Sequence, residues 1–79
     1  MHKLKLIYAQ SKSQHYKEAM THAATIQLYT QLGVECYQCS ASCIVFANSR
    51  DLTLASLTLS NSTVYTPEVV VKDSLNSKT

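Results

Sequence analysis

A chain of 79 residues with a net charge of +2 has room for one small domain, in which about 60% of the unfolded surface becomes buried. No apolar stretch approaches the roughly 20 residues of a membrane-spanning helix, so we expect no membrane partner. Three cysteines cannot all pair with one another, and the sequence therefore predicts reduced thiols and a cytoplasmic location.

The first predicted element is a strand from Lys3 to Ala9. Leu4, Leu6 and Tyr8 occupy every second position in this segment, and the residues that alternate with them are Lys3, Lys5 and Ile7. An alternation of this length predicts a strand with one buried face.

A long helix is predicted over residues 13–32, because this segment contains no Gly or Pro. Gly33 is the residue type expected just beyond a helix end, and Ser11 or Ser13 is the expected N-cap. Six residues are predicted to form the inner face: Tyr16, Ala19, Met20, Ala23, Ala24 and Ile26. Three residues near the end depart from that face, which predicts a different neighbour for the last turn: Leu28, Tyr29 and Leu32.

The stretch from Val34 to Ala47 predicts a β-hairpin at the centre of the sheet, with a break of small residues at positions 40–42. With Ala41 near the turn, two faces result: Tyr37, Ile44 and Phe46 on one, and Val34, Cys36 and Val45 on the other. Both faces are then apolar, unlike those of a sheet with one solvated side.

Residues 48–59 are ambiguous between a helix and a strand. Asn48 or Ser49 would serve as the N-cap of a helix, with Asp51 favourably placed in its first turn. However, the leucines at positions 52, 54, 57 and 59 form no single helical stripe, and the repeated Leu-Thr-Leu fits a strand with a bulge. The strand is the preferred prediction.

A turn at residues 60–62 and a final strand from Thr63 to Lys72 complete the predicted domain, which covers residues 1–72. Pro67 cannot donate a ladder hydrogen bond, so it marks an edge, a bulge or the start of the strand. Residues 73–79 are polar and are expected to fray.

Together these segments predict an α+β domain in the order β-α-β-β-(β or α)-β, with one long helix packed on a mainly antiparallel sheet. A helix at residues 49–59 would give the alternative, which resembles the ferredoxin-like split βαβ fold, and the chain length suits it. Either arrangement covers one face of the sheet and leaves the other face open.

An open sheet face between apolar strands is typical of an interface, so we expect a homodimer or a larger closed assembly. The predicted function is that of a small interaction or regulatory protein that acts by protein-protein binding on an unidentified partner. No catalytic set and no cofactor-binding motif is visible, so an independent enzyme and a cofactor are not expected. The predicted interface consists of the residues of the two hairpin faces: Val34, Cys36, Tyr37, Ile44, Val45 and Phe46.

Nucleic-acid binding is the first alternative function. Four lysines precede the first acidic residue and would form a basic end of the domain: Lys3, Lys5, Lys12 and Lys17. A dimer would double this patch and its attraction for phosphates. The single arginine and the lack of a recognisable motif make the basic end a less specific signal.

The second alternative is a small ligand- or metal-binding dimer with its site at the subunit interface. His15, Glu18 and His22 share the polar side of the predicted helix, but the sequence nominates no ligand from another element. Cys36 and Cys39 form a Cys-x-x-Cys pair, yet residues three apart in a strand point to opposite faces. The cysteines are therefore predicted to fill apolar space in the core.

Overall fold

The computed structural model describes residues 2–70 of the chain, and the predicted tail at residues 73–79 lies outside them. The described residues form four strands and two helices. In chain order these are β1 (His2–Tyr8), α1 (Gln14–Leu32), β2 (Cys36–Ser40), β3 (Cys43–Phe46), α2 (Ser49–Leu59) and β4 (Tyr65–Val70).

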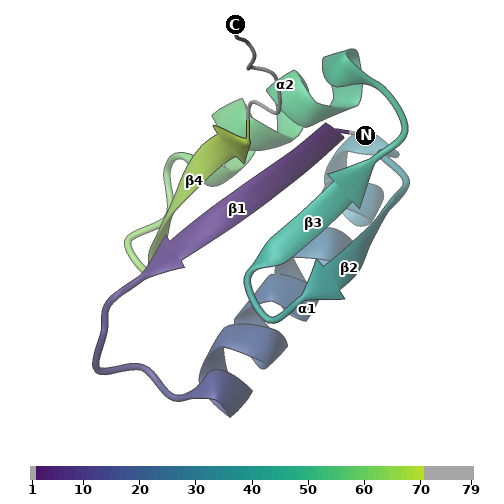
Figure 1. Ribbon diagram of the computed structural model, residues 1–79. Coiled ribbons are helices and arrows are strands. Elements are labelled where there is room, and N and C mark those ends of the chain that lie inside the picture. Colours follow the sequence, from purple (N-terminus) through teal and green to yellow (C-terminus); the bar gives the residue numbers. More distant parts are fainter. Residues whose placement is uncertain (1, 71–79) are drawn as a thin grey trace, which may run out of the picture.

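The strands form one antiparallel sheet in the order β2-β3-β1-β4, and both helices lie against the same face of it (Figure 1). The prediction of an α+β domain with a long helix on an antiparallel sheet is confirmed. Each helix joins two strands that are separated by one other strand, which is the split βαβ arrangement of ferredoxin-like folds. The face that carries neither α1 nor α2 is called the open face.

Residues 49–59 form α2, so the preferred strand prediction was wrong and its helical alternative was right. The Asn48 side chain caps α2 by accepting a hydrogen bond from the backbone N–H of Asp51 at 2.9 Å. The buried stripe consists of three residues: Leu52, Ala55 and Leu59. The leucines at positions 54 and 57 are exposed, which hid the helical period in the sequence.

α1 begins and ends within one residue of the prediction. The Ser13 hydroxyl accepts a hydrogen bond from the backbone N–H of Tyr16 at 3.1 Å, and Gly33 ends the helix with a φ of 70°. The inner face is rotated from the predicted one, because the buried residues are Thr21, Ala24 and Leu28. Three residues of the predicted inner face are exposed: Ala19, Ala23 and Ile26. Neither helix of residues 2–70 is both long enough and apolar enough to cross a membrane.

The hydrophobic core lies between the two helices and the covered face of the sheet. Leu4, Leu6 and Tyr8 of β1 point into this core, as the alternation in that strand predicts. Ile44 and Phe46 of β3 lie beside them. Each fully buried aliphatic or aromatic side chain of this kind stabilises the fold by roughly 1.5–3 kcal/mol.

The β2–β3 hairpin is present, but its side chains face differently from the prediction. Cys36 lies opposite Phe46 in the ladder and faces the helices with it, whereas Tyr37 lies opposite Val45 on the open face. The predicted groups were therefore wrong, since Tyr37 does not share a face with Ile44 and Phe46.

A β-bulge causes this difference. Next to the turn, Ser40 pairs with Cys43, and a regular ladder continued from that pair would give the predicted faces. The register shifts between Gln38 and Ser40, so Cys39 is an extra residue in β2. One extra residue reverses which side chains of the strand point to a given face.

A buried polar network ties α1 to β1 and to the hairpin. The Thr21 hydroxyl donates to the Ala41 carbonyl oxygen at 2.7 Å, which leaves it to accept from the Tyr8 hydroxyl at 2.8 Å. The Tyr8 ring also meets the rings of Tyr16 and Tyr65 edge-on, at centroid distances of 6.3 and 5.5 Å. Thr21 is fully buried, so these two hydrogen bonds satisfy a hydroxyl that water does not reach.

Candidate functional site

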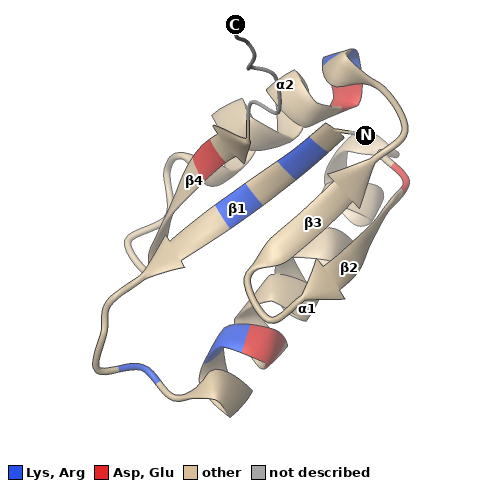
Figure 2. Ribbon diagram, in the orientation of Figure 1, with Lys and Arg blue, Asp and Glu red and all other residues tan. Residues whose placement is uncertain are grey.

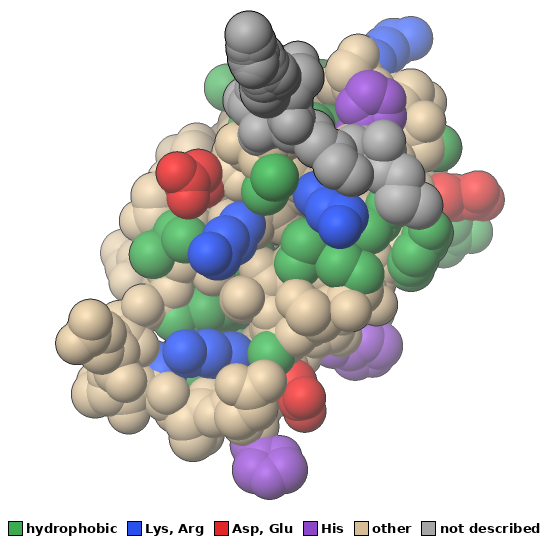
Figure 3. All heavy atoms as spheres, viewed as in Figure 1, with side chains coloured by type: hydrophobic (Ala, Val, Ile, Leu, Met, Phe, Trp, Pro, Cys, Tyr) green, Lys and Arg blue, Asp and Glu red, His purple; other side chains and the backbone are tan. Residues whose placement is uncertain are grey.

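The open face of the sheet was expected to be apolar, but it is mixed. Lys3 and Lys5 of β1 point to this face, among hydrophobic side chains of the neighbouring strands (Figure 3). Glu68 of β4 lies opposite Lys5 in the ladder. These charges reach the open face because Leu4 and Leu6, which alternate with the lysines, point into the core.

The chain's own helices cover most of the predicted interface. Three of its residues lie in the core and a fourth packs against it: Val34, Ile44 and Phe46, with Cys36 beside them. Val45 points to the open face but is only 4% exposed, whereas Tyr37 is 59% exposed. The homodimer itself stays a prediction, and Tyr37 is the part of the predicted interface that a second chain can reach.

β2 forms one edge of the sheet, and its outer side pairs with no strand of residues 2–70. Its five residues, Cys-Tyr-Gln-Cys-Ser, include no charged residue and no proline. β4, at the opposite edge, contains Pro67 and Glu68, which are residue types that discourage pairing with another chain. β2 is therefore the edge better suited to accept a further strand.

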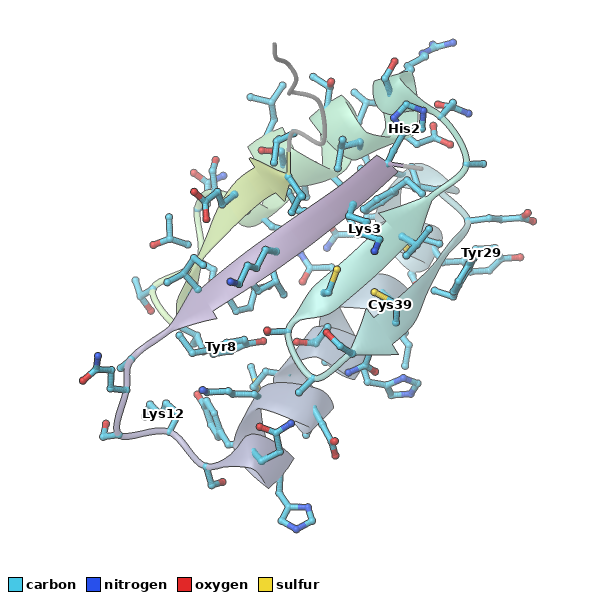
Figure 4. The ribbon with its side chains drawn as sticks, viewed as in Figure 1. His2, Lys3, Tyr8, Lys12, Tyr29 and Cys39 are labelled. Carbon is cyan, nitrogen blue, oxygen red and sulfur yellow. The ribbon has the colours of Figure 1, made fainter. Side chains whose placement is uncertain are left out.

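Exposed hydrophobic side chains border this edge. Ile26 and Tyr29 of α1 are 53% and 62% exposed, and Tyr29 projects outward beside β2 (Figure 4). Tyr37 lies on the strand itself. Neighbouring apolar side chains with this exposure are typical of binding surfaces. We call β2 together with Ile26, Tyr29 and Tyr37 the β2 surface.

Two hollows adjoin Glu35 and Cys36, where the chain enters β2. One has a volume of about 270 Å³ and is also lined by Ile26 and Tyr29. The other has a volume of about 520 Å³ and is also lined by Tyr37. The β2 surface is therefore furrowed, and such furrows accept protruding side chains of a partner.

The sequence indicated only part of this surface. Tyr29 departs from the predicted inner face of the helix, which pointed to a different neighbour, whereas Ile26 was predicted to lie on the inner face.

The three cysteines lie on two sides of the sheet. Cys36 faces the helices, and burial, with a smaller effect of the nearby Asp51 carboxylate, raises the pKa of its thiol. Cys43 lies opposite Lys5 and shares the open face with it. Cys39, in the bulge, is exposed (Figure 4). The prediction of core filling holds for Cys36 and was wrong for Cys39 and Cys43.

Cys43 should react slowly with alkylating agents at neutral pH. Burial raises the pKa of its thiol to about 11, a hydrogen bond to Cys39 adds to this, and Lys3 and Lys5 partly offset it. Only the thiolate reacts, so the alkylation rate should rise about tenfold per pH unit between about pH 8 and about pH 10. Iodoacetamide labelling at less than one label per chain, followed by peptide mass spectrometry, measures this rate.

The urea-unfolded protein is the control for this measurement, because its thiols have ordinary pKa values. Its alkylation rate at Cys43 should level off at a lower pH than that of the folded protein. Equal pH profiles for the folded and unfolded chains would contradict the raised pKa.

The lysines of the predicted basic end lie in separate places (Figure 2). Lys3 and Lys5 are on the open face. Lys12 lies in the connection between β1 and α1, where its Nζ is 4.8 Å from the centroid of the Tyr16 ring. Lys17 is on α1. The fold thus distributes the four cations over a strand, a loop and a helix.

His15, Glu18 and His22 are all exposed on α1. Within residues 2–70, no group of three or more His, Cys, Asp or Glu side chains is placed to hold a metal ion. Beside Glu18, β2 contributes a hydrogen bond instead of a metal ligand. The Gln38 side-chain amide donates to the Glu18 backbone carbonyl oxygen at 3.3 Å. The described residues therefore give the predicted metal site no ligand from a second element.

No protein-family model, no curated protein and no solved structure matches the chain. The fold and the β2 surface are therefore the features from which a function can be inferred.

Proposed function

We propose that the protein acts by protein-protein binding, as a homodimer held together at the β2 surface. The observation that carries this proposal is an uncharged edge strand bordered by exposed Ile26, Tyr29 and Tyr37. The free N–H and C=O groups of such an edge pair with a strand of another chain, and the apolar side chains beside it add buried area. The free thiols of the chain fit a reducing compartment, the cytoplasm, as its location.

A second copy of the chain is the partner that fits this surface most simply. Antiparallel pairing of two β2 strands about a two-fold axis would extend the sheet and bring the two α1 helices together. Ile26 and Tyr29 of each copy, which lie beside the start of β2, would then face the other copy. No like charges would oppose each other within the paired strands, because β2 has none.

The area that a dimer needs is larger than β2 alone supplies. A specific interface buries about 800 Å² of each partner, which is about a sixth of this chain's surface of 4955 Å². A strand of five residues covers only part of that area, so the exposed side chains of α1 have to contribute. Tyr29 is therefore the most informative residue to replace.

Replacing Tyr29 by lysine should dissociate the dimer. The substitution removes an aromatic ring from the interface and places a cation among its apolar side chains. Because Tyr29 is exposed on a helix, the variant should fold normally. We expect the dimer Kd to rise about 30-fold or more, which corresponds to the loss of about 2 kcal/mol of binding free energy that is typical of a residue essential to an interface. Sedimentation velocity over the micromolar range measures the Kd, and circular dichroism verifies the fold.

Leu57→Lys is the matched control, since Leu57 is 65% exposed on the other helix, α2. It should leave the dimer intact. A wild-type chain that stays monomeric throughout the micromolar range would overturn the homodimer. A dimer that Leu57→Lys dissociates and Tyr29→Lys preserves would overturn the β2 surface as its interface.

The two alternative functions draw less support from the geometry. A nucleic-acid site would use Lys3 and Lys5, the two lysines that share the open face, but Glu68 lies opposite Lys5 in the ladder. A ligand site at the subunit interface would use the 520 Å³ hollow beside Tyr37, at the start of β2. Both alternatives presuppose the dimer, so its measurement comes first.

A further inference from the structure

Two of the three cysteines share the open face and lie next to each other. Cys43 faces the open side because it lies opposite Lys5 in the ladder. In the β-bulge, Cys39 and Ser40 both lie opposite Cys43, and the two thiols are close enough to form a hydrogen bond. Cys36 faces the helices and is separated from this pair by the sheet.

We propose that Cys39 and Cys43 form a dithiol site that a small-molecule disulfide, such as glutathione disulfide, oxidises to an intramolecular disulfide. The Cys39 thiolate attacks one sulfur of the small disulfide, whose S–S bond breaks, and the first small thiolate leaves. Cys43 then loses its proton to water and attacks the Cys39 sulfur, which forms the protein disulfide and releases the second small thiolate. Two protein thiols are thereby oxidised, and one external disulfide is reduced to two thiols.

The different exposure of the two thiols indicates which cysteine reacts first. Cys39 is exposed, and a hollow of about 270 Å³ opens beside it, which gives a small disulfide room to approach. Cys43 is half-buried and is therefore the thiol that resolves the mixed disulfide. Lys5, opposite Cys43 on the same face, favours the thiolate that this second step needs.

The disulfide would close a loop from Cys39 to Cys43 and hold the bulge of β2 against β3. A loop this short restricts the unfolded chain by only about 2 kcal/mol, so we expect Tm to rise by about 10 °C on oxidation. The proposal rests on the positions of the two sulfur atoms within one chain, and it does not depend on the dimer.

The test uses the full chain in a glutathione redox buffer, with wild type, Cys36→Ser and Cys43→Ser compared. Intact mass spectrometry should show the loss of two hydrogen atoms in wild type and in Cys36→Ser. Peptide mapping should show Cys39 linked to Cys43. Cys43→Ser should instead retain glutathione on Cys39, because the resolving thiol is missing. Running the same reactions on Tyr29→Lys separates the result from any effect of dimerisation.

Each other product would overturn the proposal. These products are a disulfide that includes Cys36, a disulfide between two chains, and a mixed disulfide on Cys39 that persists in wild type. A wild-type chain that stays fully reduced in the oxidising buffer would also overturn it, because the Cys39 thiol would then not react with the small disulfide.

Discussion

Replacing Phe46 by alanine should lower the free energy of unfolding by about 3–5 kcal/mol. Phe46 is buried in the core beneath the helices, so the shorter side chain leaves a cavity and loses its contacts. Because a domain of this size has a total stability of about 5–10 kcal/mol, the variant should unfold at much lower urea concentrations than wild type. Urea titration followed by circular dichroism measures the difference.

Tyr37→Ala is the matched control for this prediction. Both variants are made in the Tyr29→Lys background, so that loss of the proposed dimer does not add to the measured difference. Tyr37 is also an aromatic residue of the hairpin, but it lies on the open face, so its replacement should cost less than about 1 kcal/mol. Equal losses for the two variants would contradict the β2–β3 register, which places these two residues on opposite faces. If Phe46→Ala does not fold, Phe46→Leu should still show a measurable loss of about 1 kcal/mol.

Replacing Thr21 by valine should lower the free energy of unfolding by about 1–3 kcal/mol. Valine has nearly the shape of threonine, so packing is preserved, but the Ala41 carbonyl oxygen loses its donor. The Tyr8 hydroxyl loses its 2.8 Å partner and keeps only the longer hydrogen bond that it donates to the Lys17 carbonyl oxygen, at 3.4 Å. The Thr21 side chain is fully buried, so water has little access to the position where its hydroxyl stood. Thermal and urea unfolding of the variant measure the loss.

Thr25→Val on the same helix is the matched control. The Thr25 hydroxyl donates only to the His22 carbonyl oxygen in an exposed position, so its loss should stay within about 0.5 kcal/mol. A double-mutant cycle with Tyr8→Phe should give a coupling energy of about 1 kcal/mol between Tyr8 and Thr21. Additive effects of the two substitutions would show that their hydrogen bond contributes nothing.

The elements that the sequence predicts well are those with local signals. The alternation of Leu4, Leu6 and Tyr8 sufficed for β1, and Ser13 with Gly33 marked the ends of α1. For α2 the signals conflicted. The cap at Asn48 indicated a helix, but two of the four leucines face solvent and obscured its period. Which leucines would be buried depends on contacts with the sheet, which no local pattern contains.

The faces of the hairpin and the β2 surface were harder to predict, for a common physical reason. A single extra residue, Cys39, inverts which side chains of β2 reach the open face, and the sequence around it shows no sign of a bulge. The β2 surface depends in addition on how far α1 is rotated against the sheet. That rotation turns Thr21 inward and leaves Ile26 and Tyr29 outside, although the amphipathic pattern placed Ile26 inside.

The unequal edges of the sheet would also limit how far the proposed assembly could grow. If two β2 strands pair as proposed, the remaining edge of the sheet formed by residues 2–70 is that of β4. There Pro67 removes a hydrogen-bond donor, and Glu68 would bring like charges together. A closed pair is then the end point, whereas a sheet with two bare edges would polymerise into filaments.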